Sequence, residues 1–406
     1  MLRLRGPGSV LAVLACAASL AVLPGTPAAA DTIQVDQQWV LNMMNVPAAW
    51  QLTRGGGVTV AVIDSGVNPD VSDLAGSVVT GPDYTGVSTK PSSPDWGVHG
   101  TWMASLIAGH GHDGGGSGVI GVAPRSTILS IRVIPDRNDP HYGRYSREQE
   151  PTIQNSLAEG IDYAVRHGAK VISMSIGYSA PNGAVKQALA GAYSRGVVVV
   201  ASAGNSGAPG GTVDGVQAPE SFPADYPGVI SVGAVTQGGA VAPFSSDNLS
   251  VQVAAPGVSV PAQGRDGQYW WVSGTSPACA LVAGVAALIK SKYPDLAPSL
   301  VASALTSTTT NRPPGGYNSQ VGFGIVDAGA ALAKAAKLAG DPPAPAGIAA
   351  AARFGGPAAV AQAPVRPRGS GQLFLFVLLA LTSLVLTVVA ATRLAILRRP
   401  PDDLRF

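Results

Sequence analysis

Cysteine is nearly absent from this chain, which has only Cys16 and Cys279 among its 406 residues. Residues 1–30 have the pattern of a secretory signal peptide, with basic residues before an apolar run and three alanines at its end. Cleavage before Asp31 would remove Cys16, so the mature chain can form no internal disulfide and must be stabilised by packing. The alternative, a lipoprotein processed at Cys16, is disfavoured because the apolar run continues well past that residue.

Charged residues are also scarce. Asp, Glu, Lys and Arg make up 12% of the chain, about half the usual share in globular proteins, and the formal net charge is +2. Because no basic patch is available to neutralise phosphates, we expect no nucleic-acid partner. No acidic run has the spacing of a calcium loop, so we predict no cofactor and no metal, while structural calcium is left open.

Two polar stretches interrupt the apolar pattern. His110, His112 and Asp113 carry metal-binding side chains, but ligands adjacent in sequence rarely make a site without others from elsewhere in the fold. We therefore interpret this glycine-rich stretch as a solvated loop. Residues 136–150 mix charges of both signs, which is typical of a surface loop that could contact a partner.

One long uncharged run lies near the end of the chain. Residues 372–393 contain an uncharged stretch of about 20 residues, enough to cross a bilayer as a helix, and we predict one transmembrane helix there. The Pro-, Ala- and Gly-rich residues 341–371 are predicted to be a linker and the basic residues 394–406 a cytoplasmic tail. We expect a single-pass cell-membrane protein whose folded part, residues 31–340, lies on the extracytoplasmic side.

The folded part alternates apolar runs with helical patterns, which predicts an α/β domain with a mainly parallel sheet flanked by helices. The runs lack polar alternation, as expected for strands buried on both faces. The expected strands are 58–64, 128–134, 171–176, 197–203, 229–235 and 251–255, and the expected helices are 100–108, 152–167, 184–194, 276–292, 298–306 and 327–338. Reactive groups in such sheets gather at the carboxyl ends of the strands.

Three short motifs contain an aspartate, a histidine and a serine in that order: AVIDSG with Asp64, HGT with His99 and GTSPA with Ser276. A serine hydroxyl attacks an amide when a base removes its proton and an acidic group orients the base. We predict that Asp64 is the orienting acid, His99 the general base and Ser276 the nucleophile. Each motif alone is typical of a turn or a helix start. Three unrelated hydrolase folds carry the same three residues in three different chain orders, so the order found here is far more specific than any one motif.

The residue after the nucleophile restricts how an oxyanion could be bound. Pro277 has no N–H, so it cannot supply the donor that α/β-hydrolases take from this position. Asn205, at the end of an expected strand, offers a side-chain amide, and the backbone N–H of Ser276 offers a second donor. The structural interpretation of Asn205 is a turn residue before a glycine.

The chain resembles the subtilisin-like serine proteases from about residue 46 to residue 338. Beyond the triad, the matching segments are GVAP at 121–124, ISMSIG at 172–177, ASAGN at 201–205, YPGVISVGAV at 226–235 and VAAPG at 253–257. The resemblance implies a catalytic domain over 31–340 and a polypeptide substrate. It also implies that Ser175, Ile176 and Gly177 pair with the extended substrate and line its pocket.

Within that family the chain is most similar to the mycosins, the membrane-anchored proteases associated with type VII secretion in actinobacteria. The likeness rests on MNVPAAWQLTRGGGVTVAVIDSGVNP at 44–69, on the signal peptide and on the linker with one span. It implies an endopeptidase that cleaves secreted polypeptides beside a type VII secretion complex. Two alternatives stay open: a structural subunit with dispensable activity, contacting its partner through 136–150, and a surface protease without a secretion partner.

The sequence departs from the family pattern beside the expected active site. Ala280 stands where subtilisins usually have a proline, and Trp102 directly follows the HGT motif. Both departures raise the question of whether catalysis is slowed. Cys279, which would be the only cysteine of the mature chain, is expected to pack as a small apolar residue, because no basic group nearby would activate it. The stretch between the signal and the first motif is too short for a folded inhibitory pro-domain.

Overall fold

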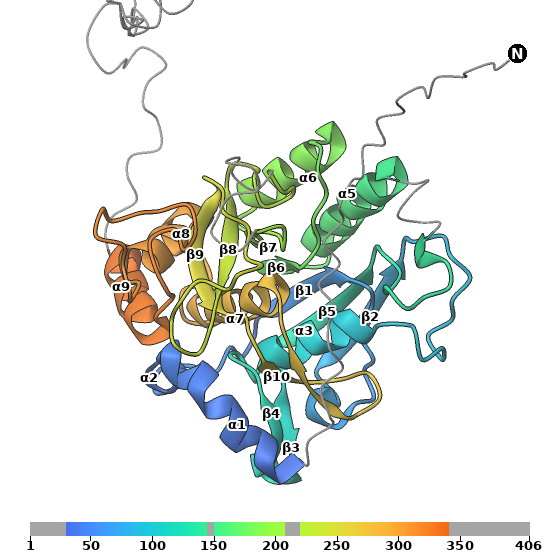
Figure 1. Cartoon of the computed structure of the whole chain (residues 1–406), viewed down its shortest axis with the longest axis horizontal. Coiled ribbons are helices and arrows are strands. Elements are labelled where there is room, and N and C mark those ends of the chain that lie inside the picture. The colour runs from blue at the N-terminus through green and yellow to red at the C-terminus, as the bar shows by residue number, and fades with distance from the viewer. Residues whose placement is uncertain (1–29, 144–149, 208–219, 341–406) are drawn as a thin grey trace, which may run out of the picture. The chain divides into compact units, whose positions relative to one another are not determined.

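The computed structural model describes residues 30–143, 150–207 and 220–340 (Figure 1). The predicted signal peptide, linker, transmembrane helix and tail lie outside these residues. The chain divides into two units, Met1–Pro342 and Pro343–Phe406, and every described residue belongs to the first. Among the described residues, no helix is both long enough and apolar enough to cross a membrane.

The core of the domain is a seven-stranded sheet in which every neighbouring pair of strands is parallel. The strand order is β2-β5-β1-β6-β7-β8-β9. The bounds are β1 (Thr59–Asp64), β2 (Val78–Asp83), β5 (Thr127–Arg132), β6 (Val171–Met174), β7 (Val198–Ser202), β8 (Val229–Val235) and β9 (Val251–Pro256). The predicted parallel α/β sheet is therefore confirmed, and six of its strands fall on the expected runs.

Helices cover both faces of this sheet (Figure 1). Successive side chains of a strand point to opposite faces, so Val60 and Val62 of β1 pack with α3 (Val98–Ala108) and α7 (Thr275–Lys292). Ala61 and Ile63 pack with the other layer, α5 (Glu150–Arg166) and α6 (Gly183–Ser194). Both sets of side chains are buried, which explains why the strands are continuous apolar runs in the sequence.

The remaining elements surround this three-layered core. They are α1 (Ala30–Met43), α2 (Val46–Trp50), α8 (Pro298–Ser307), α9 (Ala328–Gly340), the short helices η1 (Ser72–Leu74) and η2 (Asp113–Gly115), and the hairpins β3 (His110–His112) with β4 (Ser117–Ile120) and β10 (Val260–Gln263) with β11 (Tyr269–Val272). The sequence predicted α8 and α9 but not the hairpins, whose strands are only three or four residues long. It also missed β2, an edge strand without a buried residue that contains both glycine and proline.

Helix α1 is another element that the sequence analysis did not predict. Ile33, Gln37 and Val40 are buried on one face of α1, at the three- and four-residue spacing that could have revealed the helix. The Gln37 side chain donates to the carbonyl of Ile120 at 2.8 Å and accepts from the N–H of Ile120 at 3.0 Å. Because one buried amide satisfies both backbone groups of a β4 residue, α1 is fixed to the catalytic domain.

The strand order places a topological switch point at β1. Strand β1 lies between β5 and β6. After β1 the chain forms β2 and β5 on one side of it, and then crosses to form β6 on the other side. In parallel α/β sheets, reactive groups collect outside the carboxyl ends of the strands at such a point. Asp64 is the last residue of β1, and Asn205 follows shortly after the end of β7.

We predict that Gly284→Ala destabilises the protein. A Cβ on Gly284, inside α7, would lie 2.6 Å from Cβ of Val122, and overpacking of a core costs about 1–3 kcal/mol. Gly191→Ala in α6 is the matched control, because the nearest atom is the flexible end of Arg195 at 3.3 Å and alanine favours a helix by up to about 1 kcal/mol.

Urea unfolding followed by tryptophan fluorescence, in a Ser276→Ala background that prevents self-digestion, measures both free energies of unfolding. We expect a decrease for Gly284→Ala and no decrease for Gly191→Ala. A Gly284→Ala protein as stable as its parent would contradict the packing of α7 on Val122.

Candidate active site

Asp64 and His99 form a hydrogen-bonded pair at the carboxyl edge of the sheet. Asp64 is 1% exposed, and its Oδ1 lies 2.8 Å from Nδ1 of His99 and 2.7 Å from the N–H of Ser65. His99 is the second residue of α3, and its side chain is 31% exposed. Because a carboxylate only accepts hydrogen bonds, Nδ1 carries the proton and Nε2 is left as a base.

The surroundings of His99 make its imidazolium more stable than usual. Burial lowers the pKa of His99, but the charge of Asp64, its hydrogen bond to Nδ1 and the charge of Asp136 more than offset this effect. Arg137 acts in the opposite direction. The pKa of His99 is therefore raised above its ordinary value of 6.5.

Ser276 lies at the start of α7, the long helix that runs through the core. The helix begins at Thr275, one residue before the expected start, because Gly274 takes a φ of 152° that favours glycine and caps the helix. Pro277 is thus the third helical residue, still within the first turn, where N–H groups have no partner inside the helix. Ser276 is partly exposed at the positive end of the helix dipole.

The side chain of Asn205 is fixed beside the start of α7. Its Oδ1 accepts from the N–H of Thr275 at 2.8 Å and from the Thr275 hydroxyl at 2.9 Å. A backbone N–H can only donate, so these contacts identify the amide oxygen and leave Nδ2 as the donor. A Cβ placed on Gly274 would lie 3.4 Å from Nδ2, which puts this donor next to the segment that carries Ser276.

The segment expected to bind substrate follows directly after β6. The Ser175 hydroxyl donates to the carbonyl of Ser276 at 3.1 Å, so this segment touches the residue after Thr275. Ile176 is buried, and a Cβ on Gly177 would lie 2.8 Å from the Ser221 hydroxyl. The structure therefore places Ser175 against the expected nucleophile, with Ile176 and Gly177 next along the chain, while the contact of all three with a substrate stays a prediction.

Both departures from the family pattern pack against the apolar core. Ala280 is fully buried in α7. The rings of Trp102 and His99 meet edge to face, with their centroids 6.4 Å apart. The centroids of the Trp102 and Trp270 rings are also 6.4 Å apart. Trp102 thus restricts the imidazole on one side, in a geometry that aromatic pairs favour.

Cys279 lies in the core, as expected of a small apolar residue. Its Sγ is 3.8 Å from the Ser173 hydroxyl and 3.7 Å from the carbonyl of Met174. Burial raises the pKa of the Cys279 thiol to about 12. The thiolate is therefore negligible at neutral pH, and Cys279 is unsuited to be a nucleophile.

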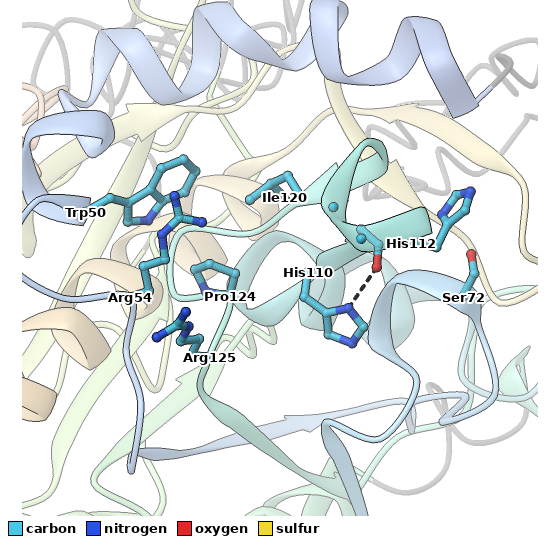
Figure 2. Close-up of a pocket in the computed structure, with 11 residues that line it drawn as sticks. Trp50, Arg54, Ser72, His110, His112, Ile120, Pro124 and Arg125 are labelled. Atoms are coloured by element: carbon cyan, nitrogen blue, oxygen red, sulfur yellow. Dashed lines mark hydrogen bonds between the residues drawn. The ribbon is translucent and has the colours of Figure 1, made fainter.

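The interpretation of the stretch around His110 and His112 as a solvated loop was wrong for residues 110–112, whereas residues 113–116 are exposed. Residues 110–112 form β3, and His112 Nδ1 lies 2.7 Å from the carboxylate of the buried Asp73. His110 Nδ1 lies 2.8 Å from the carbonyl of Gly111. Figure 2 shows the two rings pointing in different directions along a cavity of about 640 Å³, so they do not converge on one ion.

The interpretation of residues 136–150 as a surface loop was also wrong for its first part. Asp136 is 5% exposed and Asp139 is 3% exposed. Asp139 lies 3.3 Å from the guanidinium of Arg132, which is itself 1% exposed. The sequence was misleading because charge was taken to mean exposure, whereas these carboxylates have partners that only the fold brings close.

The fold and this site together define a class of protein. The sequence profile of the subtilase family, peptidase S8, matches residues 55–324. The chain therefore belongs to the subtilase family of serine endopeptidases. The resemblance found in the sequence is confirmed at this level.

Individual relatives give the same result. The chain is 40% identical over 258 residues to subtilisin DY of Bacillus licheniformis, which covers 64% of this chain and 85% of that protein. It is 33% identical to thermitase of Thermoactinomyces vulgaris over 256 residues, 63% of this chain and 83% of that one.

Solved structures of mycosins are similar to this one. The MycP3 protease from the type VII (ESX-3) secretion system is 32% identical, with a TM-score of 0.63 over 77% of this chain and 90% of that chain. MycP1 from Mycobacterium smegmatis is 30% identical, with a TM-score of 0.60 over 76% of this chain and 89% of that chain. The predicted likeness to mycosins is therefore confirmed.

We predict that activity falls on acidification at a higher pH than an ordinary histidine would give. A general base must be neutral, so kcat/KM should rise with pH through the pKa of His99. Because that pKa is raised, the half-maximal point should lie above 6.5.

Hydrolysis of a chromogenic peptide from roughly pH 5 to pH 9 measures this rise of kcat/KM with pH, which we call the acid limb. The rate of labelling by an uncharged fluorophosphonate should show the same limb and serves as a control for ionisation of the substrate. A half-maximal point at or below about 6.5 would contradict the balance of charges around His99.

Proposed function

We propose that this subtilase is a membrane-anchored, extracytoplasmic endopeptidase that cleaves secreted polypeptides through an acyl-enzyme, in association with type VII secretion. The observation that carries the catalytic part is the 2.8 Å bond between Asp64 and Nδ1 of His99, which leaves Nε2 as a base. The nucleophile in this proposal is Ser276, at the first turn of α7.

The first chemical step follows from these positions. Nε2 of His99 takes the proton of the Ser276 hydroxyl while Oγ attacks the scissile carbonyl carbon. The positive charge that develops on the imidazole lies against the buried carboxylate of Asp64, where solvent screens it little. Asp64 thus orients the ring and stabilises the imidazolium.

The negative charge that develops on the carbonyl oxygen needs donors that are already in place. Asn205 Nδ2 is oriented by the two bonds from Thr275 to Oδ1, and the N–H of Ser276 is the second donor. The intermediate then expels the amine, which takes the proton from His99, and leaves an ester on Ser276. Water attacks this ester by the same route, with His99 again acting as the base.

The location rests on the sequence. Residues 1–30 are read as a signal peptide and 372–393 as a single membrane span, which would hold the protease on the extracytoplasmic side. The association with secretion is supported by the neighbours, since MycP3 is described as a protease from the type VII (ESX-3) secretion system.

The structural-subunit alternative loses part of its expected contact surface. It relied on residues 136–150, and both Asp136, which bonds the N–H of His99, and Asp139, which pairs with Arg132, are buried rather than exposed to a partner. Secretion that survives Ser276→Ala but fails on deletion of the chain would favour the alternative over our proposal. A surface protease without a secretion partner would leave secretion intact after deletion.

We predict that a fluorophosphonate labels the full-length protein in detergent at Ser276. A hydroxyl next to a competent base and oxyanion donors reacts, whereas an ordinary serine does not. Ser276→Ala should abolish labelling, and Ser273→Ala, which changes an exposed serine in the same segment, should preserve it. Intact-mass spectrometry gives the extent of labelling; a folded wild-type protein that stays unlabelled would contradict the proposal.

Asn205→Ala tests the oxyanion donor separately. Loss of one such donor typically lowers kcat by roughly 100- to 1,000-fold. Because the donor acts on charge that appears only in the transition state, KM should change little. Asn42→Ala, an exposed position on α1, is the control and should have wild-type kinetics. If Asn205→Ala changed KM alone, Asn205 would bind the ground state and not the oxyanion.

A further inference from the structure

Helix α3 begins at a carboxylate that comes from another part of the chain. The first N–H groups of a helix have no partner inside it and need an acceptor. Asp136 supplies both oxygens: Oδ2 accepts from the N–H of Val98 at 2.9 Å and Oδ1 from the N–H of His99 at 2.8 Å. Gly97, the residue before α3, gives the helix no side-chain cap, so Asp136 takes that place.

The residue after Asp64 completes this cap. The Ser65 hydroxyl accepts from the N–H of Gly100 at 3.1 Å and also hydrogen-bonds to Asp136. The N–H of Thr101 is bonded to the carbonyl of Gly97 at 3.1 Å. Every N–H in the first turn of α3 therefore has an acceptor. The two bonds to Asp136 hold the backbone of Val98 and His99.

Buried charges fix the position of Asp136 in turn. The guanidinium of Arg132 bonds the carbonyl of Ser65 at 3.1 Å and the carboxylate of Asp139 at 3.3 Å. The N–H of Asp139 donates to the carbonyl of Asp136 at 3.0 Å. Because Arg132 ends β5 directly opposite Asp64 of β1, one set of contacts ties the strand end, the loop and the helix start together.

We propose that Asp136 is a positioning residue for catalysis, a second carboxylate that holds the general base through the backbone of His99. It contacts neither substrate nor Ser276, and it acts by fixing where the first turn of α3 begins. A displacement of about 1 Å in a catalytic group can reduce the rate roughly 100-fold, so this anchor matters for kcat. The inference rests on the proposed role of His99 as the base.

Asp136 also changes the electrostatics of the helix end. The N-terminus of a helix carries a partial positive charge, which opposes a proton on an imidazole placed there. The charged groups facing His99 are Asp64 and Asp136, which stabilise the imidazolium, and Arg137, which destabilises it. Removing the charge of Asp136 should therefore lower the pKa of His99.

The test is Asp136→Asn in the full-length protein, assayed on a chromogenic peptide across pH. An amide has one acceptor oxygen and an NH2 group that only donates, so it cannot accept from Val98 and His99 through separate oxygens, and kcat per active site should fall roughly 10- to 100-fold with KM little changed. The acid limb of kcat/KM should move to lower pH, because a less basic His99 stays neutral in more acidic solution. Fluorophosphonate titration counts the active sites, which corrects for any misfolded fraction.

Two further variants make the result decisive. Asp95→Asn removes a carboxylate just before α3 that caps no helix N–H, and should keep the wild-type kcat and acid limb. Asp136→Ser keeps one acceptor without the charge, so it should restore part of kcat while the limb stays shifted. If Asp136→Asn yields no protein that fluorophosphonate can titrate, Asp136→Ser is used in its place.

The outcomes separate this inference from the proposed function. A wild-type kcat and acid limb in both Asp136 variants, with normal labelling of the wild type, would overturn only the role of Asp136. A loss of active sites without any change in kcat per site or in the limb would show a merely structural role, and would overturn it as well. A folded wild type that is not labelled would overturn both proposals.

Discussion

A buried arginine at the carboxyl edge of the sheet is the constraint on which the active site depends. Arg132 is 1% exposed, and a buried guanidinium destabilises a fold by several kcal/mol unless each of its donors has a partner. Asp83 at 2.7 Å and Asp139 at 3.3 Å supply the opposite charges. The carbonyl of Ser65 accepts from Nε, and this bond fixes the backbone directly after Asp64. The charged network thus also positions Asp64, the proposed orienting acid.

Local sequence patterns were sufficient for the sheet, for its covering helices and for the motifs of Asp64, His99 and Ser276. Each depends on contiguous residues: an apolar run for a strand, a 3.6-residue period for a helix. Asp136 could not be found in this way, because its partners are N–H groups that lie 37 and 38 positions earlier. Only the pairing of β1 with β5 brings them together. The two hairpins and β2 were missed because short or exposed strands carry little periodicity.

The scarcity of cysteine and charge has a physical counterpart in the packing. The described residues contain one free cysteine, Cys279, and so rely on two apolar layers, one on each face of the sheet, with α7 buried along almost its whole length. The few charges that are buried are paired, as Arg132 is, or bonded to backbone, as Lys290 is to the carbonyl of Leu296 at 2.9 Å. Because buried charges need such partners, a polar stretch such as 136–150 contains structural residues and not only surface ones.

Helices α3 and α7 both begin at the carboxyl edge of the sheet, but their positive ends have different partners. The start of α3 is filled by the protein's own carboxylate, Asp136, which holds the helix in place and offsets its dipole under His99. The start of α7 has only a neutral acceptor, Oδ1 of Asn205 on the N–H of Thr275, and Pro277 removes one N–H from its first turn. The N–H of Ser276 and Nδ2 of Asn205 are the donors that the proposed mechanism assigns to the oxyanion at this helix start. An enzyme that stabilises a transient oxyanion needs this asymmetry, because a resident carboxylate at α7 would occupy the site that the reaction must fill.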